Sequence, residues 1–138
     1  MDEREESEAL ETALRALRHR DLSEADLERR LAARGFDEAE REAALDTLRR
    51  TDLLDDRRFA ESRAGALAAR GSGDALIRYD LERAGVAAEL VEHALALVPS
   101  EAERAGRVVE RRGRGPKTAR YLRGKGFSDE TVAAFAAD

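Results

Sequence analysis

The sequence contains no cysteine, no tryptophan and only two prolines. The lack of cysteine excludes disulfides, thiolate zinc sites and cysteine nucleophiles. Aromatic residues make up 4% of the chain, so the hydrophobic 42% is mostly alanine and leucine. With so few helix breakers, long stretches are free to be helical, and their core must be built from small and aliphatic side chains.

Long apolar segments are also absent. The longest apolar run, Val132–Ala137, has six residues, whereas a membrane-spanning helix needs about 20. The first residues are acidic, where a secretory signal would be basic and then apolar. We therefore expect a soluble, cytoplasmic protein with no membrane association. A length of 138 residues fits one domain or a few very small ones.

Charge is unevenly distributed along the chain. Residues 1–99 hold 16 basic and 24 acidic side chains, a net of −8, whereas residues 100–138 hold nine and six, a net of +3. Between Arg104 and Lys125 there are nine basic residues and one acid, Glu110. This local excess favours a polyanionic partner at the C-terminal end. The alternative is a solvated basic face that balances an acidic body.

A pattern of five positions occurs three times. A leucine is followed four residues later by a glycine and then by an apolar residue. It is preceded by an arginine eleven residues earlier and by an aliphatic residue fourteen residues earlier. The copies are spaced by 50 and 41 residues, which is typical of stacked helical repeats. The matching residues are Leu17, Arg20, Leu31, Gly35 and Phe36, then Leu67, Arg70, Leu81, Gly85 and Val86, then Val108, Arg111, Leu122, Gly126 and Phe127.

Each copy is predicted to form three helices. In the first copy, apolar residues recur at helical spacing before Ser23, which suits the N-cap of a second helix. Gly35 is placed to end that helix in the left-handed conformation. Asp37 and Glu40 match the capping box of a third helix. The apolar residues of the first helix are Leu10, Leu14 and Leu17.

The second and third copies follow the same plan. Asp55 or Asp56 is the predicted cap that begins the second copy, and glycine-rich breaks follow its first helix and that of the third copy. Pro116 suits a first helical position. We predict an all-α fold of three tandem three-helix repeats, similar to helix-turn-helix modules, in an elongated, curved array. The predicted domains are residues 7–50, residues 51–98 and the basic residues 99–138.

Several ordered motifs resemble those of the RecX family of recombination regulators. The segment Leu53–Ala60 resembles a hallmark of that family, and the residues after it keep the family's phasing. The series from Arg18 to Phe36 looks similar to the family's first module. The resemblance covers roughly residues 9–137 and is strongest over residues 17–98. The residues that keep the phasing are Arg70, Gly71, Gly73, Ile77, Leu81, Gly85 and Val86.

The resemblance implies a regulator that binds RecA recombinase. Members of this family are thought to lodge in the groove of the RecA–DNA filament. There they restrain filament growth, strand exchange, ATP hydrolysis and the co-protease activity that triggers the SOS response. For this chain the resemblance therefore implies a non-enzymatic role in DNA repair and homologous recombination, with the RecA filament as the partner.

The basic side chains of the third copy, together with Tyr121, are candidate contacts to the partner or to nucleic acid. On the helix predicted after Pro116, Lys117 and Arg120 lie near one face, with Arg123 less closely aligned. Arginine binds phosphate or carboxylate through paired hydrogen bonds. Tyr121 could stack on a base or pack its ring on the edge of the core. The candidates are Arg104, Arg107, Arg111, Arg112, Arg114, Lys117, Arg120, Tyr121, Arg123 and Lys125.

A second set of candidate partner contacts lies in the second copy, where acidic residues are interleaved. Exposed salt bridges of this kind contribute little to stability, and a solvated surface is the alternative interpretation. Arg20, Arg70 and Arg111 recur at one repeat position near a helix end, where either the helix dipole or a shared partner contact would account for them. The secondary candidates are Arg57, Arg58, Arg70, Arg78 and Arg83.

The sequence offers little for catalysis. His19 and His93 are the only histidines and occupy different repeat positions, so a metal site would need carboxylates gathered around one of them. The serines lack the context of a nucleophile elbow, and the glycine-rich breaks lack the strand that precedes a nucleotide-binding loop. We predict no enzymatic activity, no metal and no cofactor.

Two other functions remain open at this stage. A stand-alone helical DNA-binding module is the alternative to a RecA regulator, because three-helix units resemble helix-turn-helix domains. The acidic first two copies weigh against it, since free DNA would repel them. An array that serves as a scaffold for some other protein is the third possibility. We expect a monomer that binds a RecA filament, with single- or double-stranded DNA contacted through the basic C-terminal copy.

Overall fold

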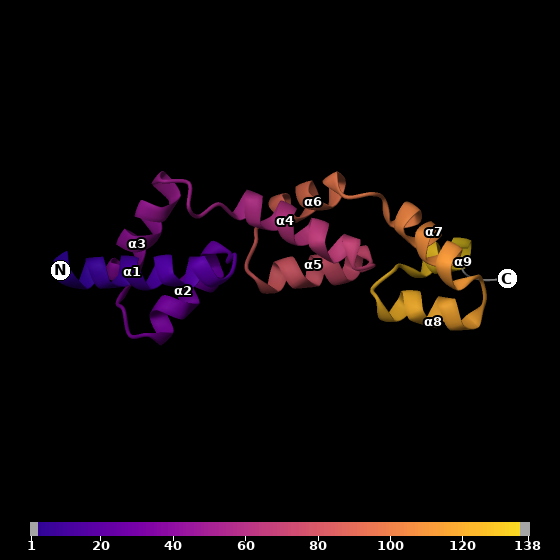
Figure 1. The fold of residues 1–138 in the computed structure, drawn as a ribbon, viewed down its shortest axis with the longest axis horizontal. Coiled ribbons are helices and arrows are strands. Elements are labelled where there is room, and N and C mark those ends of the chain that lie inside the picture. The colour runs from indigo at the N-terminus through magenta and orange to yellow at the C-terminus, as the bar shows by residue number, and fades with distance from the viewer. Residues whose placement is uncertain (1–2, 136–138) are drawn as a thin grey trace. The chain divides into compact units, whose positions relative to one another are not determined.

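The computed structural model describes residues 3–135, which form nine α-helices and no strand (Figure 1). The predicted all-α class is confirmed. We call α1–α3 the first module, α4–α6 the second and α7–α9 the third. The helices are α1 (Glu3–His19), α2 (Glu24–Ala33), α3 (Glu38–Arg50), α4 (Asp56–Ala69), α5 (Asp74–Arg83), α6 (Ala88–Leu97), α7 (Glu101–Arg112), α8 (Pro116–Gly124) and α9 (Asp129–Phe135).

The chain divides into two compact units. The first holds the described chain up to Phe59 together with Ala84–Val86. The second holds Ala60–Arg83 and the described chain from Ala87 onward. Because the division falls within α4, residues of the second module belong to both units. The domain limits expected from the sequence stay a prediction.

Local capping sets the helix ends of the first module, as the sequence predicts. The Ser23 hydroxyl accepts a hydrogen bond from the backbone N–H of Asp26 at 3.1 Å and begins α2. Gly35 follows α2 with φ +92°, a conformation that is favourable for glycine because it has no Cβ. Asp37 and Glu40 form a reciprocal capping box at the start of α3, with both hydrogen bonds at 2.8 Å.

The core of the first module differs in one respect from the sequence pattern. Ala9 and Ala13 are the residues of α1 that are completely buried, whereas the predicted stripe of leucines in that helix is only partly buried around them. Small side chains at these two positions let α1 approach α3 closely, so the leucines flank the contact. The buried partners are Leu22, Leu27, Leu31, Ala44, Leu45, Leu48 and Leu54.

The structure decides which residue caps the first helix of the second module, for which the sequence offered Asp55 or Asp56. The Asp55 carboxylate accepts hydrogen bonds from the backbone N–H groups of Arg57 and Arg58 at 3.0 and 3.1 Å, so Asp55 caps α4. Further along the module, α5 packs against α6. Their buried residues are Ile77, Leu81, Val91 and Ala94.

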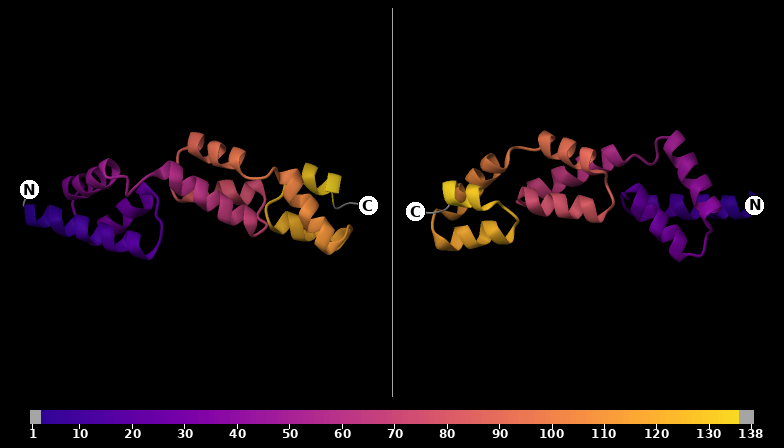
Figure 2. Two further views of the ribbon diagram at one scale, coloured as in Figure 1. Left: turned by 45° about the horizontal axis from the view of Figure 1, so that its top comes forward. Right: turned by 180° about the vertical axis from the view of Figure 1, so that it is seen from behind.

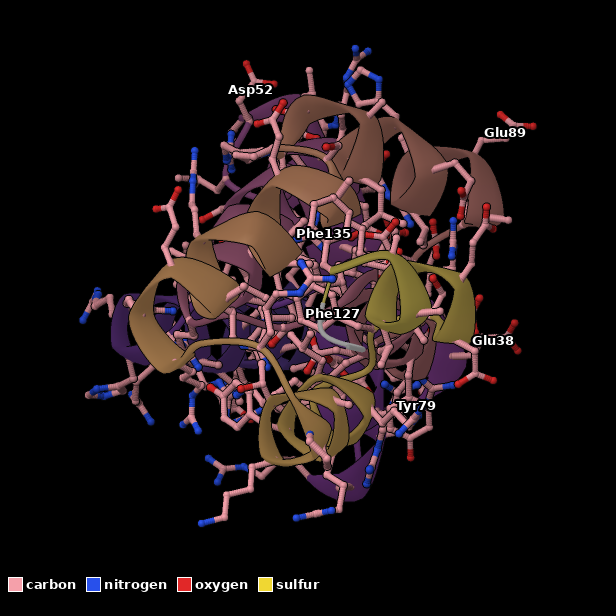
Figure 3. The ribbon with its side chains drawn as sticks, turned by 90° about the vertical axis from the view of Figure 1, so that its right-hand side faces the viewer. Glu38, Asp52, Tyr79, Glu89, Phe127 and Phe135 are labelled. Atoms are coloured by element: carbon pink, nitrogen blue, oxygen red, sulfur yellow. The ribbon has the colours of Figure 1, made fainter. Side chains whose placement is uncertain are left out.

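In the third module, α7, α8 and α9 lie against one another (Figure 2). Pro116 opens α8, as the sequence predicts. Phe127 and Phe135 lie between the ribbons of this module (Figure 3), and Phe127 is 5% exposed. Thr118 is buried at the repeat position that Leu27 and Ile77 fill in the other modules. This module therefore buries less apolar surface at that position.

Within the first unit, the N-terminus of α2 meets residues that follow α5. The Ser23 hydroxyl donates to the Ala84 carbonyl at 2.5 Å. A Cβ at Gly85 would lie 2.5 Å from the Cβ of Ala25. The backbone N–H of Glu24 donates to the Asp56 carboxylate at 2.8 Å. We call these residues the first junction.

Within the second unit, the N-terminus of α5 meets residues that follow α8 in the same way. The backbone N–H of Gly73 donates to the Lys125 carbonyl at 2.7 Å. A Cβ at Gly126 would lie 2.7 Å from the Cβ and backbone N of Leu76. The backbone N–H of Asp74 donates to the Glu101 carboxylate at 3.1 Å. These residues, with Ser72 and Arg104, form the second junction.

None of the helices between residues 3 and 135 is long and apolar enough to cross a membrane.

Candidate functional site

Most of the predicted basic cluster lies on the surface of the third module. Its exposed side chains come from the C-terminal half of α7, the connector after it, and α8. Lys125, which follows α8, is partly buried. The exposed members are Arg107, Arg111, Arg112, Arg114, Lys117, Arg120 and Arg123.

Arg104 is the exception, and its place among the candidate contacts needs correction. Its residue is 4% exposed. The guanidinium donates to the carbonyls of Ser72 and Pro99 and to the Asp74 carboxylate, the last at 2.6 Å. It also lies 5.9 Å from the centre of the Phe127 ring. A buried cation with these partners holds the second junction together and is not available to a binding partner.

Tyr121 lies partly buried at the edge of the third core. The guanidinium carbon of Arg112 lies 3.5 Å from the centre of its ring, which is a cation–π contact. This arrangement matches the interpretation in which the ring packs on the core edge. One face of Tyr121 is covered by Arg112, so a base could stack there only if Arg112 moved away.

The remaining cations of the third module are available to a partner to different degrees. Lys117 and Arg120 of α8 are exposed, and neither makes a side-chain ion pair with another described residue. Arg123 lies 3.6 Å from the Asp129 carboxylate. Arg107 and Arg111 line a surface pocket of about 370 Å³ that also includes Ala68, Ala69 and Gly71. Within the second unit, cations from α7 therefore border the end of α4.

The secondary candidates of the second module are mixed. Arg78 forms a bidentate ion pair with Glu92, with distances of 2.8 and 2.9 Å, and this pairing raises the pKa of Arg78. Arg83 donates to the Tyr79 hydroxyl at 3.4 Å. Arg58 and Arg70 are exposed. Arg78 therefore fits the interpretation as a salt-bridged surface residue. A role of these five arginines in partner binding stays a prediction.

The two histidines have different surroundings. His93 lies 2.9 Å from the carboxylate of Glu61 on α4. Among the described residues, no group of three or more side chains could hold a metal ion. His19 lines a pocket in the first module with residues that the sequence analysis did not single out.

That pocket contains the functional candidates that the sequence analysis missed. Three arginines accompany His19 there, one on α2 and one at its C-cap, where the averaged acidity of residues 1–99 conceals them. Their spacing offers a signal, because the two basic residues that α1 contributes to the pocket are four apart, as are the two at the end of α2, and each pair shares a helix face. The basic residues are Arg15, His19, Arg30 and Arg34.

Family models match most of the helical chain. The first three-helix domain of RecX matches residues 9–48. The second three-helix domain of RecX matches residues 55–95. The chain belongs to the RecX family. Its first and second modules are thus the counterparts of the two named RecX domains, and the resemblance seen in the sequence is confirmed.

RecX relatives match the chain over nearly its whole length. The protein named regulatory protein RecX of Vibrio parahaemolyticus is 30% identical over 133 residues, covering 89% of this chain and 86% of the relative. The RecX of Thermus thermophilus is 40% identical over 124 residues, covering 88% and 84%. The chain is thus a member of a family of regulatory proteins.

Solved RecX structures share the fold. The crystal structure of RecX from Lactobacillus salivarius aligns with a TM-score of 0.79 at 22% identity, covering 95% of this chain and 94% of that one. A second crystal structure of regulatory protein RecX aligns with a TM-score of 0.80 at 24% identity, covering 98% and 79%. Because the alignments cover nearly the whole chain, they extend the likeness in fold to the third module.

Proposed function

We propose that this protein regulates a RecA recombinase by binding the RecA–DNA filament. It would restrain filament growth, strand exchange, ATP hydrolysis and co-protease activity in the cytoplasm, acting as a monomer without a cofactor or a catalytic step. Membership of the RecX family supports the regulatory role. We propose that the exposed cations of the third module contact the filament, and their exposure is the structural observation on which this contact rests.

The charge of the third module supports a nucleoprotein partner. The chain as a whole has a net charge of −5, yet nine basic residues and one acid lie between Arg104 and Lys125. Seven of those basic residues are exposed on one module. Exposed guanidinium groups bind phosphate or carboxylate through two hydrogen bonds. A filament of protein and DNA presents both kinds of anion, whereas naked DNA presents phosphate alone and is opposed by the net charge of −8 on residues 1–99.

A comparison of partners tests the proposal. The full chain is titrated with naked single-stranded DNA, naked duplex and a RecA–DNA filament, each over a salt series, and RecA ATP hydrolysis is followed in parallel. We expect binding to the filament to be much tighter than to bare DNA, with ATP hydrolysis reduced. Equal binding to all three, with a steep salt dependence, would favour a stand-alone DNA-binding module. Absence of filament binding would refute the proposal.

A charge-matched pair of variants tests the site. Lys117→Ala with Arg120→Ala removes two exposed cations of α8 that make no ion pair within the described chain. Arg29→Ala with Arg50→Ala removes two cations of the first module that pair with Asp26 and Asp46.

We expect the α8 variant to bind the filament about a hundredfold more weakly, because it loses two charge-assisted contacts that contribute about 1.5 kcal/mol each. The control should bind like the wild type, and both should keep its helical circular dichroism. A loss of helicity in the α8 variant would show that these residues are needed for the fold. Unchanged binding would show that the cluster is a solvated surface with no role in filament binding.

A further inference from the structure

The first module contains a pocket of about 350 Å³ between α1 and α2. Four of its seven lining residues are basic, and none is acidic. The others are small, so the floor between the charges is formed by methyl groups and by the aliphatic stems of the arginines. The lining residues are Thr12, Arg15, Ala16, His19, Arg30, Ala33 and Arg34.

The basic side chains of this pocket have no anionic partner within the described chain. No ion pair or side-chain hydrogen bond joins Arg15, His19, Arg30 or Arg34 to any residue from 3 to 135. All four residues are exposed. The other arginines of α2 and α3 behave differently, since Arg29 and Arg49 each pair with a nearby carboxylate. The pocket therefore concentrates positive charge that the fold itself does not neutralise.

The repeat shows that these cations are not required by the fold. At the positions of Arg15, His19, Arg30 and Arg34, the second module has no cation and the third has one. The second-module residues are Gly65, Ala69, Asp80 and Ala84, and those of the third are Gly106, Glu110, Tyr121 and Lys125. Three-helix modules of the same plan thus form without them. A general helix-dipole preference does not account for a feature of one module alone.

The pocket also lies beside a face that the other modules use for packing. Gly85 and Gly126 approach Ala25 and Leu76 in the two junctions. At Gly35, the equivalent residue of the first module, no heavy atom beyond its chain neighbours lies within 4 Å of where a Cβ would be. Arg34, its neighbour, is exposed and lines the pocket.

We propose that this pocket binds the phosphate backbone of a nucleic-acid strand. Arg15 and His19 lie on α1, and Arg30 and Arg34 lie on α2 and at its C-cap. The residues of each pair are four apart, so their Cβ atoms lie about 5–6 Å from each other on one face. Guanidinium groups bind phosphate oxygens in pairs and stack on bases. The apolar floor provided by Ala16 and Ala33 suits the face of a sugar or base.

A nucleic-acid strand fits better than an acidic peptide. Exposed pairs between arginine and carboxylate each contribute about 0–1 kcal/mol. A phosphate backbone adds the release of condensed counterions, which a peptide lacks. The pocket also lies between two helices, so it offers no sheet edge to hold an extended peptide.

Two charge-matched variants of the full chain test this site without RecA. Arg30→Ala with Arg34→Ala removes two pocket cations, and Arg29→Ala with Arg50→Ala removes two paired cations of the same module. Binding of a labelled single strand of about 20 nucleotides is measured by fluorescence anisotropy from about 25 to about 200 mM salt. Circular dichroism checks that both variants fold.

The pocket variant should bind the strand about a hundredfold more weakly at the lowest salt concentration and about fivefold more weakly at the highest. The slope of log affinity against log salt should fall by about 1.4, because each phosphate contact on a single strand contributes about 0.7. The control should change affinity less than about twofold. Equal changes in the two variants, or an unchanged slope, would overturn the proposal. Poly-glutamate of matched charge should compete poorly, and competition as strong as that of DNA would identify an acidic protein surface instead.

The result is independent of the proposed RecA function. If the protein fails to bind a RecA filament but the pocket variant still weakens strand binding, the pocket stands and the regulatory proposal falls. If filament binding depends on α8 alone and the pocket variant binds the naked strand like the wild type, the regulatory proposal stands and the pocket proposal falls.

Discussion

The two junctions have the same geometry but are built from different residues. At equivalent repeat positions, Ser23 donates to a carbonyl through its hydroxyl, whereas Gly73 donates through its backbone N–H. In both junctions a carboxylate from the start of a module's first helix accepts from a helix N-terminus, Asp56 in one and Glu101 in the other. The repeat therefore preserves the positions of donors and acceptors, and the side chains that supply them vary.

The junctions differ most in their arginines. Glu24 pairs with Arg49 of its own module at a partly exposed site. Asp74, at the same repeat position, pairs with Arg104 of the third module, whose side chain is 3% exposed. The second junction thus contains a buried arginine, Arg104, whereas the arginine that pairs with Glu24 in the first junction is partly exposed. Several variants would separate the contributions of charge, close packing and protonation.

The largest expected effect is that of Arg104→Ala. Removing this cation leaves two carbonyls and the Asp74 carboxylate without their donor in a buried site, which should destabilise the protein by about 3–5 kcal/mol. Arg49→Ala should cost about 1 kcal/mol or less, since its pair is partly exposed. Urea unfolding followed by circular dichroism measures both. Equal losses would mean that burial does not distinguish the junctions.

Replacing the three repeat glycines by alanine should give graded effects. Gly35→Ala should cost about 1–2 kcal/mol, because its positive φ strains an L residue while the space around it is open. Gly126→Ala should cost about 2–5 kcal/mol, since its Cβ would also meet the backbone of Leu76. Gly85→Ala should lie between them, because it meets only the Cβ of Ala25.

A second substitution sharpens the comparison of glycines. Ala25→Gly removes the atom that a Cβ at position 85 would strike, so it should recover part of the stability that Gly85→Ala loses. The double variant is compared with both single variants by urea unfolding. If Ala25→Gly rescued nothing, close approach would not be the reason for glycine in the first junction.

The smallest expected effect is a difference in pH dependence between the two junction carboxylates. Burial raises the pKa of Asp56 above its ordinary value of 3.8, although the Glu24 N–H opposes this. Burial also acts to raise the pKa of Glu101, but hydrogen bonds from Thr131, Asp74 and Ser128 outweigh it and hold that pKa below 4.5. The two groups should therefore contribute to stability with opposite signs.

The direction follows from which state binds more protons. Folded Asp56 holds its proton more tightly than the unfolded chain does, so its contribution weakens as pH rises from about 3.8 through the raised folded pKa. Folded Glu101 releases its proton more readily, so its contribution is present above pH 4.5 and is lost as pH falls. Urea midpoints of Asp56→Asn and Glu101→Gln, each compared with the wild type between about pH 3 and pH 7, should diverge from it in opposite directions. Parallel curves would refute this.

Local features were predictable from the sequence because they depend on neighbours in the chain. The cap at Ser23, the capping box at Asp37 and the left-handed Gly35 each follow from a few adjacent residues. The burial of Arg104 was not predictable, because nothing in the run of basic residues distinguishes it from Arg107. Two of its partners, Ser72 and Asp74, lie about 30 residues earlier and meet it only when the modules pack.

The second role of the repeat glycines was hidden for the same reason. Gly85 and Gly126 fit the pattern as helix ends, but their close approach to Ala25 and Leu76 depends on a neighbouring module. The first-module pocket was missed because a count over residues 1–99 averages its cations with many acids. Charge counted along the sequence located the third-module cluster, whereas charge gathered from two helices required the fold.

The contact between Arg112 and Tyr121 has a practical consequence for optical measurements. The chain has two tyrosines and no tryptophan, so its near-ultraviolet emission comes from Tyr79 and Tyr121 alone. Tyr79 is 59% exposed on α5, whereas the ring of Tyr121 lies under a guanidinium. A Tyr79→Phe chain would keep a single intrinsic fluorophore in the third module. Displacement of Arg112 by an incoming anion could then be followed without any attached dye.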